Sequence, residues 1–291
     1  MRSLLFVPGN SEKKLAKGFA SVADVIIVDL EDSVAAQDKE TARTIAADFI
    51  GQNRGNAKAA IYVRVNDLAT GLTDADLAVV IKARPDGIML PKSNGQRDIE
   101  NLAARLRVAE AQSGVADGAT RIVAIMTETA AGVLGAGTYS EPLSRLAGLT
   151  WGAEDLSAAI GAHSARDEAG NYTHLFQLAR SMTLLAAASA GVEPIDTVFP
   201  NFRDAAGFER ECREALRDGF TGKMAIHPDQ VPIINEVFTP SEESLRQARA
   251  VVQTFAEAGN PGVVAIGGKM YDRPHLRLAE RLLTRAATLK P

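Results

Sequence analysis

Residues 25–32 read VIIVDLED, a β-branched apolar run that ends in three acidic side chains. An unbroken run of this length is typical of a strand that is buried on both faces, as in a parallel sheet. Seven further runs of the same character follow or precede it. The eight predicted strands span residues 3–8, 25–30, 60–65, 87–91, 121–127, 146–152, 194–199 and 223–228.

Segments with apolar residues at helical spacing separate these runs, for example Leu178, Met182 and Leu185. Strand and helix therefore alternate along the chain, which predicts an α/β fold with a parallel sheet. Eight such units close most naturally into a (β/α)8 TIM barrel, a fold of roughly 250 residues. An open, doubly wound sheet is the alternative, but no GxGxxG motif follows the first run to support its dinucleotide-binding form.

The composition is that of an ordinary globular protein, with 46% hydrophobic residues, 23% charged residues and a net charge of −4. No excess of Lys and Arg indicates a nucleic-acid partner, and no apolar stretch reaches the ~18 to 20 residues that span a bilayer. The N-terminal residues do not resemble an export signal. The single cysteine, Cys212, has no partner for a disulfide, which favours a cytoplasmic location and a structural role.

The chain changes character after residue 238. Ser241 is a plausible N-cap for a helix that carries Val251 and Phe255, and a loop over residues 259–262 follows. A short apolar run over residues 263–266, two glycines and a last helix from about Pro274 complete the sequence. We therefore predict a barrel over residues 1–238 and a C-terminal helical extension over residues 239–291, which serves as packing or as a lid.

Polar side chains stand at the downstream ends of five predicted strands, where the active sites of TIM barrels form. These strand ends read Asp29-Leu30-Glu31-Asp32, Arg64-Val65-Asn66, Pro91-Lys92, Thr127-Glu128-Thr129 and Gly152-Ala153-Glu154-Asp155. Taken alone, each of these polar groups could have a purely structural role. Asp32 and Glu154 suit a helix cap or the surface, and Asp32 could pair with Lys39 or Arg43 on the next helix.

Glu128 and Asp155 follow neighbouring predicted strands, so the barrel would bring their carboxylates close together. Two adjacent carboxylates repel unless one is protonated or a cation lies between them. Mg²⁺ fits a site of this kind, because it takes one or two protein carboxylates and completes its shell with water and substrate oxygens. A shared proton, or a salt bridge to Arg64, is the alternative.

Arg64 ends the third predicted strand, where its guanidinium could hold a substrate carboxylate with two parallel hydrogen bonds. Its alternative role is a buried ion pair with Asp29 or Glu31. A metal ion beside an arginine indicates a small 2-oxo or 2-hydroxy acid, whose enolate the metal would stabilise.

The four histidines show neither HxH nor HExxH spacing, so they do not predict a transition-metal site. His227 is the only one at a strand end. It either lines the mouth of the barrel or has a structural role.

Several motifs, in this order, resemble the citrate lyase β-subunit family of the HpcH/HpaI aldolase superfamily, which includes malyl-CoA and citramalyl-CoA lyases. The resemblance extends from the first residues to near the C-terminus. It rests on residues 2–10 (RSLLFVPGN), 29–34 (DLEDSV), 63–66 (VRVN), 90–92 (LPK), 128–129 (ET), 151–156 (WGAEDL), 219–223 (GFTGK) and 226–231 (IHPDQV).

The resemblance implies a Mg²⁺-dependent carbon–carbon lyase that cleaves an acyl-CoA thioester to an acyl-CoA and a 2-oxoacid. It implies that Glu128 and Asp155 hold the metal and that Glu128 and Arg64 contact the substrate. It also assigns substrate contacts to Phe6, Pro8, Lys14, Ile226 and His227, and a supporting role around the site to Asp29, Glu31 and Asp32. Lys14 could instead be a solvated residue on an exposed helix face.

The segment over residues 267–274 resembles the tail of the CoA lyases in the family, in which an aspartate reaches a neighbouring subunit's site. Asp272 matches that aspartate, and we expect it to act as an acid or base near the thioester carbon. Tyr271 and Arg273, on either side of it, are bulkier than the family pattern. The alternative is that Asp272 caps the last helix.

Two other functions stay open. The chain could be a citrate lyase β-subunit that works on citryl thioesters within a complex, or a class II aldolase that cleaves free hydroxy acids. By analogy with the family we expect a homotrimer, or a hexamer built from trimers. Neither a nucleic acid nor a membrane is an expected partner.

Overall fold

The computed structural model describes residues 1–140 and 143–289. Eight parallel strands close into a barrel in sequence order, and the last pairs with the first. These strands are β1 (Ser3–Pro8), β2 (Val25–Asp29), β3 (Ala60–Arg64), β4 (Gly87–Leu90), β5 (Arg121–Ile125), β6 (Leu146–Thr150), β7 (Glu193–Asp196) and β8 (Gly222–Ala225). The prediction of a TIM barrel is confirmed.

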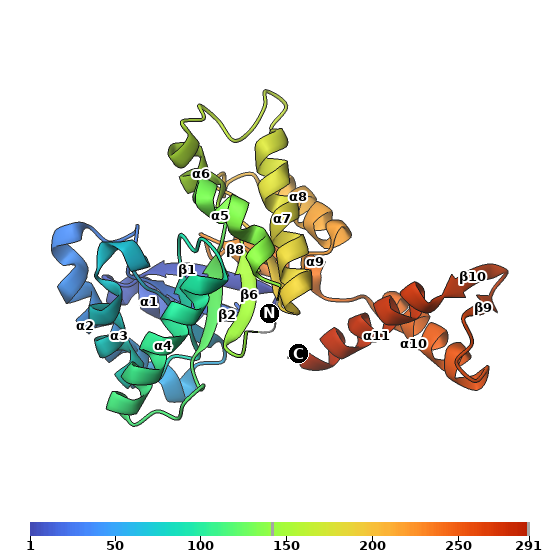
Figure 1. The fold of residues 1–291 in the computed structure, drawn as a ribbon, viewed down its shortest axis with the longest axis horizontal. Coiled ribbons are helices and arrows are strands. Elements are labelled where there is room, and N and C mark those ends of the chain that lie inside the picture. Colours follow the sequence, from blue (N-terminus) through green and yellow to red (C-terminus); the bar gives the residue numbers. More distant parts are fainter. Residues whose placement is uncertain (141–142, 290–291) are drawn as a thin grey trace. The chain divides into compact units, whose positions relative to one another are not determined.

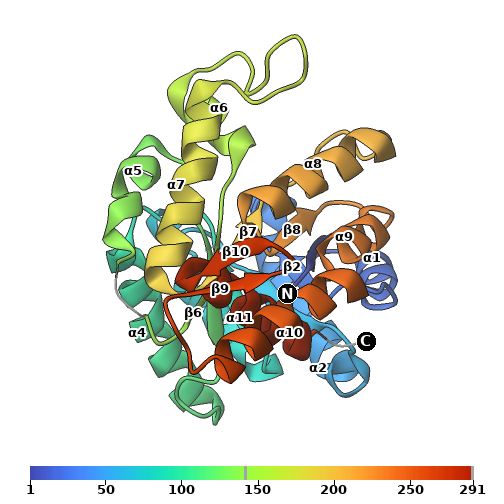
Figure 2. The ribbon, with the colours of Figure 1, turned by 90° about the vertical axis from the view of Figure 1, so that its right-hand side faces the viewer.

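Helices surround the barrel strands (Figures 1 and 2). They are α1 (Glu12–Phe19), α2 (Lys39–Asn53), α3 (Thr73–Val80), α4 (Gln96–Ser113), α5 (Ala130–Gly135), α6 (Ala153–Ile160), α7 (His174–Ala190) and α8 (Ala205–Asp218). Short 3₁₀ turns are η1 (Ala36–Asp38), η2 (Arg54–Asn56), η3 (Leu68–Thr70), η4 (Ile81–Ala83) and η5 (Ala136–Thr138). Local signals set the helix ends: the Ser11 hydroxyl accepts the Lys14 N–H at the start of α1, and Gly114 ends α4 with a φ of 63°.

Side chains from seven of the strands fill the barrel interior. This cluster contains Leu4, Val25, Ile27, Tyr62, Met89, Val123, Ile125, Ile195 and Met224, all of them buried. Because successive residues of a strand point to opposite faces, the alternate residues of the same strands pack against the helices. All five residues of β2 are buried, which explains why the run reads as continuously apolar until Asp29.

Most observed strands end one or two residues before their predicted ends. The predicted strand over residues 146–152, for example, pairs only as far as Thr150. The residues beyond that point leave the ladder and form the loops that carry the polar side chains. The periodicity of the sequence marks an apolar run, but it does not show where main-chain pairing stops.

The chain divides into two compact units, one from Met1 to Asn235 and a second that begins at Glu236. The division falls within α9 (Gln230–Phe238), whereas the sequence placed it after residue 238. Residues 290 and 291, the last two of the predicted extension, lie outside the described residues.

The second unit consists of two helices and a hairpin. They are α10 (Glu242–Glu257), β9 (Val263–Ile266), β10 (Lys269–Asp272) and α11 (Arg273–Thr288). Ser241 caps α10 as predicted. The sequence missed β10; Gly267 and Gly268, with φ of 56° and 77°, form the two-residue turn that pairs it with β9.

A small apolar core holds this unit together. Ala248, Val251 and Phe255 of α10 pack with Val264 of β9 and with Leu276 and Ala279 of α11. Within the described residues of the whole chain, no helix is both long enough and apolar enough to cross a membrane.

Candidate active site

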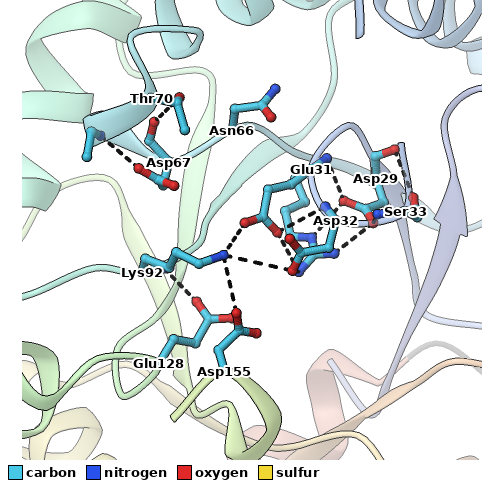
Figure 3. Close-up of polar contacts among 12 residues, drawn as sticks. Asp29, Glu31, Asp32, Ser33, Asn66, Asp67, Thr70, Lys92, Glu128 and Asp155 are labelled. Carbon is cyan, nitrogen blue, oxygen red and sulfur yellow. Dashed lines mark hydrogen bonds and ion pairs between the residues drawn. The ribbon is translucent and has the colours of Figure 1, made fainter. Parts of the chain in front are cut away.

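Charged side chains from five neighbouring strands meet where those strands end (Figure 3). Asp29 ends β2 and Arg64 ends β3, while Lys92, Glu128 and Asp155 lie in the segments that follow β4, β5 and β6. The carboxyl ends of parallel strands share one rim of the barrel, so these side chains converge although they are far apart in sequence.

Arg64 and Asp29 form an ion pair with two parallel hydrogen bonds. The distances are 2.7 Å from Nε to Oδ1 and 2.7 Å from Nη2 to Oδ2, and Nη1 lies 3.0 Å from Glu31 Oε2. Burial alone would raise the pKa of Asp29, but the hydrogen bond and charge of Arg64 hold it below its ordinary value. The alternative pairing of Arg64 with Asp29 and Glu31 is therefore present in the structure.

This pairing does not use up the donors of Arg64. A guanidinium carries five N–H groups, and these three contacts engage three of them. Asp29 fixes the plane of the guanidinium. The Phe6 ring lies beside it, with its centroid 4.9 Å from Arg64 Cζ. The remaining N–H groups can bind an anion whose position the ion pair has already defined.

Glu128 and Asp155 point toward one another, as the sequence predicted (Figure 3). The Glu128 side chain is almost completely buried, and burial together with the nearby charge of Asp155 raises its pKa to about 8, against the lowering effect of the Lys92 N–H. The glycine at position 152 makes room for this carboxylate, because a Cβ there would lie 2.7 Å from Glu128 Cγ.

Lys92 contacts both sides of this carboxylate pair. Its main-chain N–H donates to Glu128 Oε2 at 2.6 Å, and its ammonium lies 3.5 Å from Asp155 Oδ1 while bonding to Glu31. The cation in direct contact with the pair is Lys92, while Arg64 acts on Glu128 through its charge and pairs with Asp29 and Glu31 instead. The sequence placed Lys92 at a strand end but gave it no role, since nothing in it shows that residue 92 has a left-handed φ of 51°.

The residues present fit a divalent cation. In this cluster the five carboxyl groups of Asp29, Glu31, Asp32, Glu128 and Asp155 meet two cationic side chains, those of Arg64 and Lys92. Among the described residues no group of three or more His, Cys, Asp or Glu side chains is arranged around a metal position. The two carboxyl groups of Glu128 and Asp155 match an ion that takes two carboxylates and completes its shell with water and substrate oxygens, as Mg²⁺ does.

Asp32 lies at the edge of this cluster. Its carboxylate is 3.8 Å from both Arg64 Nη1 and Lys92 Nζ, and its side chain is exposed. The alternative of a pairing with Lys39 or Arg43 is not what the structure has. Lys39 instead donates to the main-chain oxygens of residues 30 and 31, and Arg43 pairs with Asp76.

Three of the expected substrate contacts, Lys14, Ile226 and His227, lie on two other strand-end segments. Lys14 is exposed on α1, after β1. His227 follows β8 and stacks on Phe202 with 4.8 Å between ring centroids, and the N–H groups of Ile226 and His227 donate to Gln230 Oε1.

Asp272 belongs to the second unit and caps α11, as the alternative reading held. Its Oδ1 accepts the His275 N–H at 3.4 Å and lies 2.5 Å from His275 Nδ1. The hydrogen bond from the His275 side chain lowers the pKa of Asp272, so the carboxylate is favoured. Its catalytic role stays a prediction.

A buried ionic network behind the site was not predicted. The Lys223 side chain is 0% exposed, and its ammonium lies 2.7 Å from Asp196 and 2.9 Å from Glu211. Asp196 also accepts the indole N–H of Trp151 at 2.8 Å. Because Trp151 begins the segment that leads to Asp155, this network fixes the start of that segment. The network was not predicted because each of its residues lies in a run whose pattern indicates only a strand or a helix.

The fold and the rim of charged residues define an α/β-barrel enzyme of the aldolase type. A model of the HpcH/HpaI aldolase/citrate lyase family matches residues 2–228, and the chain belongs to that family.

Known proteins resemble the chain over nearly all of its length. Rat mitochondrial citramalyl-CoA lyase is 32% identical, covering 99% of this chain and 87% of that protein. The citrate lyase β subunit of Leuconostoc mesenteroides is 32% identical (97% and 92% covered), as is a (3S)-malyl-CoA thioesterase of Cereibacter sphaeroides (99% and 95%). The expectation of a carbon–carbon lyase is confirmed by these lyase relatives.

Solved structures agree. Protein CitE of Mycobacterium tuberculosis, in complex with magnesium, acetoacetate and coenzyme A, matches with a TM-score of 0.75 and 31% identity, covering 98% of both chains. A second CitE structure, with magnesium and pyruvate, has a TM-score of 0.72, 29% identity and 97% coverage of both chains.

Proposed function

We propose that the protein is a Mg²⁺-dependent lyase that cleaves a 3-hydroxyacyl-CoA thioester of the malyl-CoA or citramalyl-CoA type to an acyl-CoA and a 2-oxoacid. The observation that carries this proposal is the pair of facing carboxylates, Glu128 and Asp155, on the same rim as Arg64. The magnesium and coenzyme A of the M. tuberculosis complex support it.

Glu128 and Asp155 would hold the ion, which when bound supplies a Lewis acid for the negative oxygen charge that develops during cleavage. Burial and the nearby charge of Asp155 raise the pKa of Glu128, and a cation bound between the two carboxylates would offset both effects. Asp29, Glu31 and Asp32 support the site by fixing Arg64 and Lys92.

Arg64 would bind the carboxylate of the oxoacid half through the N–H groups that Asp29 and Glu31 leave unused. A guanidinium held in one plane can match a carboxylate with two bonds, and it defines where the adjacent carbon lies. Phe6 supports the guanidinium from one side.

The bond changes follow from retro-Claisen chemistry. A base removes the proton of the 3-hydroxyl, the oxygen electrons form the carbonyl of the 2-oxoacid, and the carbon–carbon bond breaks. Its electron pair passes to the thioester as an enolate, which an acid then protonates at carbon to give the acyl-CoA.

Asp272 would exchange the proton at the thioester carbon. We propose that it does so in a neighbouring copy of the chain, within a homotrimer or a hexamer of trimers, with residues 239–291 acting as a lid. Its place at the end of β10, the strand that follows the two-glycine turn, and its favoured ionised state support a role as a base in the condensing direction.

The coenzyme A moiety would lie along Pro8, Lys14, Ile226 and His227. Pro8 ends β1 and Lys14 follows it, while Ile226 and His227 follow β8, and these two strands are paired neighbours in the barrel. An exposed lysine can bind a phosphate as a point charge.

The test is to incubate the purified chain with malyl-CoA, citramalyl-CoA and citryl-CoA, with Mg²⁺ or with EDTA, and to identify both products by chromatography. We expect an acyl-CoA and a 2-oxoacid in equal amounts, only with Mg²⁺, and a loss of turnover in Glu128→Gln. Free CoA without a 2-oxoacid would indicate thioester hydrolysis, the activity in the name of the C. sphaeroides relative. Turnover of free malate or citramalate would favour the aldolase, and turnover of citryl-CoA alone the citrate lyase subunit.

A further inference from the structure

One residue, Lys92, is bonded to both carboxylates of the proposed metal site. The main chain donates to Glu128 Oε2 at 2.6 Å, and the ammonium lies 3.5 Å from Asp155 Oδ1. Residue 92 has a φ of 51°, a conformation that a residue with a side chain adopts at a cost and that concentrates at functional sites. This φ sets the direction that the side chain takes from the peptide group that donates to Glu128.

The ammonium of Lys92 is held among carboxylates on more than one side. It bonds to Glu31 and lies 3.8 Å from Asp32, in addition to its contact with Asp155 (Figure 3). Its side chain is about three-quarters buried, with 26% exposed. Fixed charges in such a position interact more strongly than those on an open surface.

Resting on the Mg²⁺ site of the proposed function, we infer that Lys92 is the resident counter-ion of that site. Its ammonium neutralises Asp155 while the metal is absent, and an incoming Mg²⁺ displaces it from Asp155. The main-chain bond to Glu128 stays in place throughout and keeps that ligand oriented.

Two opposite effects follow for metal binding. The main chain of Lys92 pre-organises Glu128, which favours the metal. The ammonium repels a divalent cation, which weakens metal affinity in the absence of substrate. Removal of the ammonium alone should therefore tighten Mg²⁺ binding, which is the opposite of what a structural or substrate-binding lysine would give.

The experiment is titration calorimetry of the substrate-free protein with Mg²⁺, after treatment with EDTA, in wild type, Lys92→Met and Lys92→Arg. We expect Lys92→Met to lower the Kd for Mg²⁺ about tenfold or more and Lys92→Arg to stay within about threefold of wild type, because only the methionine removes the charge. Lys82→Met is the matched control. Lys82 is exposed in η4, at the opposite end of β4 from Lys92. Lys82→Met removes the same charge from the protein as Lys92→Met but far from the metal site, so the Kd for Mg²⁺ should not change.

A second measurement, on Lys92→Gln, tests the same inference if Lys92→Met folds poorly. The rise in Tm on adding Mg²⁺ should be larger in Lys92→Gln than in wild type, since the metal replaces a counter-ion that the variant lacks. An unchanged or weaker Mg²⁺ affinity in Lys92→Met, with binding abolished in Asp155→Asn, overturns the role of Lys92 and leaves the metal site standing. Unaltered Mg²⁺ binding in both Asp155→Asn and Glu128→Gln overturns the metal site itself.

Discussion

The guanidinium of Arg64 is fixed by Asp29 through two hydrogen bonds of 2.7 Å each, so the proposed substrate anchor is itself anchored. Asp29 is buried, so without Arg64 it would lose the cation that its carboxylate pairs with, whereas Arg64 without Asp29 would keep only its contact with Glu31 in the inner part of the rim. The pair therefore couples the stability of the barrel rim to the recognition of the substrate.

Arg64→Lys should lower kcat/KM for malyl-CoA or citramalyl-CoA by about 100-fold or more, because a lysine retains the charge but cannot keep the planar two-bond pairing. Steady-state kinetics checks this. Asp29→Asn is the companion variant, because it keeps the guanidinium but removes the charge that fixes it. We expect kcat/KM to fall in this variant too, and the free energy of unfolding to fall by about 3 kcal/mol. Wild-type kinetics in Arg64→Lys would refute the role of the guanidinium fork.

Mg²⁺ affinity should depend on pH through Glu128. Its pKa of about 8 lies above the ordinary 4.5, so the metal must displace a proton at neutral pH. We expect the Kd for Mg²⁺ to fall up to about tenfold per pH unit between pH 6 and pH 8, measured by calorimetry. A Kd that is flat over this range would show that Glu128 is already ionised.

The same shift predicts the stability of the metal-free protein. A carboxyl group with a raised pKa in the folded state binds more protons folded than unfolded between about pH 4.5 and pH 8. The contribution of Glu128 is therefore fully present below about pH 4.5 and is lost as the pH rises through 8. Urea unfolding in EDTA at several pH values measures this effect. The free energy of unfolding should depend less on pH between 4.5 and 8 in Glu128→Gln than in wild type.

Gly152→Ala should impair the site without unfolding the barrel. Its Cβ would lie 2.7 Å from Glu128 Cγ, so the carboxylate must move. We expect Mg²⁺ affinity and turnover to fall at least tenfold. Gly51→Ala is the matched control, because nothing lies within 4 Å of a Cβ there and the substitution in α2 should stabilise the helix by about 0.5–1 kcal/mol.

Lys223→Met should destabilise the barrel by about 3–5 kcal/mol, since it leaves Asp196 and Glu211 without their buried cation. Denaturant unfolding measures this loss. Adding Asp196→Asn should cost less than the two single losses combined, because the network is a single unit. Additive losses would show that the two charges act independently.

A mixture of two inactive variants tests the role of Asp272 in trans. If one site takes Glu128 from one subunit and Asp272 from its neighbour, a site in an equal mixture of Glu128→Gln and Asp272→Asn is intact when both neighbours contribute the unchanged residue. Random mixing gives this in about one quarter of the sites, so co-refolded oligomers should recover about one quarter of wild-type turnover. Each variant refolded alone is the control. No recovery from a mixed oligomer would mean that Asp272 acts, if at all, within its own chain.

The barrel and the facing carboxylates could be predicted from the sequence because both follow from position along a strand. Apolar runs mark strands buried on two faces, and strand ends share one rim, so Glu128 and Asp155 had to converge. The role of Lys92 could not be predicted in this way. It depends on a positive φ at a single residue and on the reach of a long side chain across the mouth.

The buried network of Lys223, Asp196 and Trp151 was equally hidden. Lys223 and Asp196 lie within or beside apolar runs, and a charge at such a position reads as the end of a strand rather than as half of a buried pair. The strand β10 was missed because its residues, Lys269 to Asp272, lack the β-branched pattern and pair only through the glycine turn.

The central claim is that Glu128 and Asp155 jointly bind a divalent cation. The most direct measurement is the anomalous scattering of crystals soaked in Mn²⁺, which takes the place of Mg²⁺ at oxygen sites. We predict one anomalous peak at bonding distance, about 2.0–2.3 Å, from an oxygen of each carboxylate, and its absence in Asp155→Asn. A peak elsewhere, or none at this pair in a wild-type crystal that binds Mn²⁺, would contradict the account.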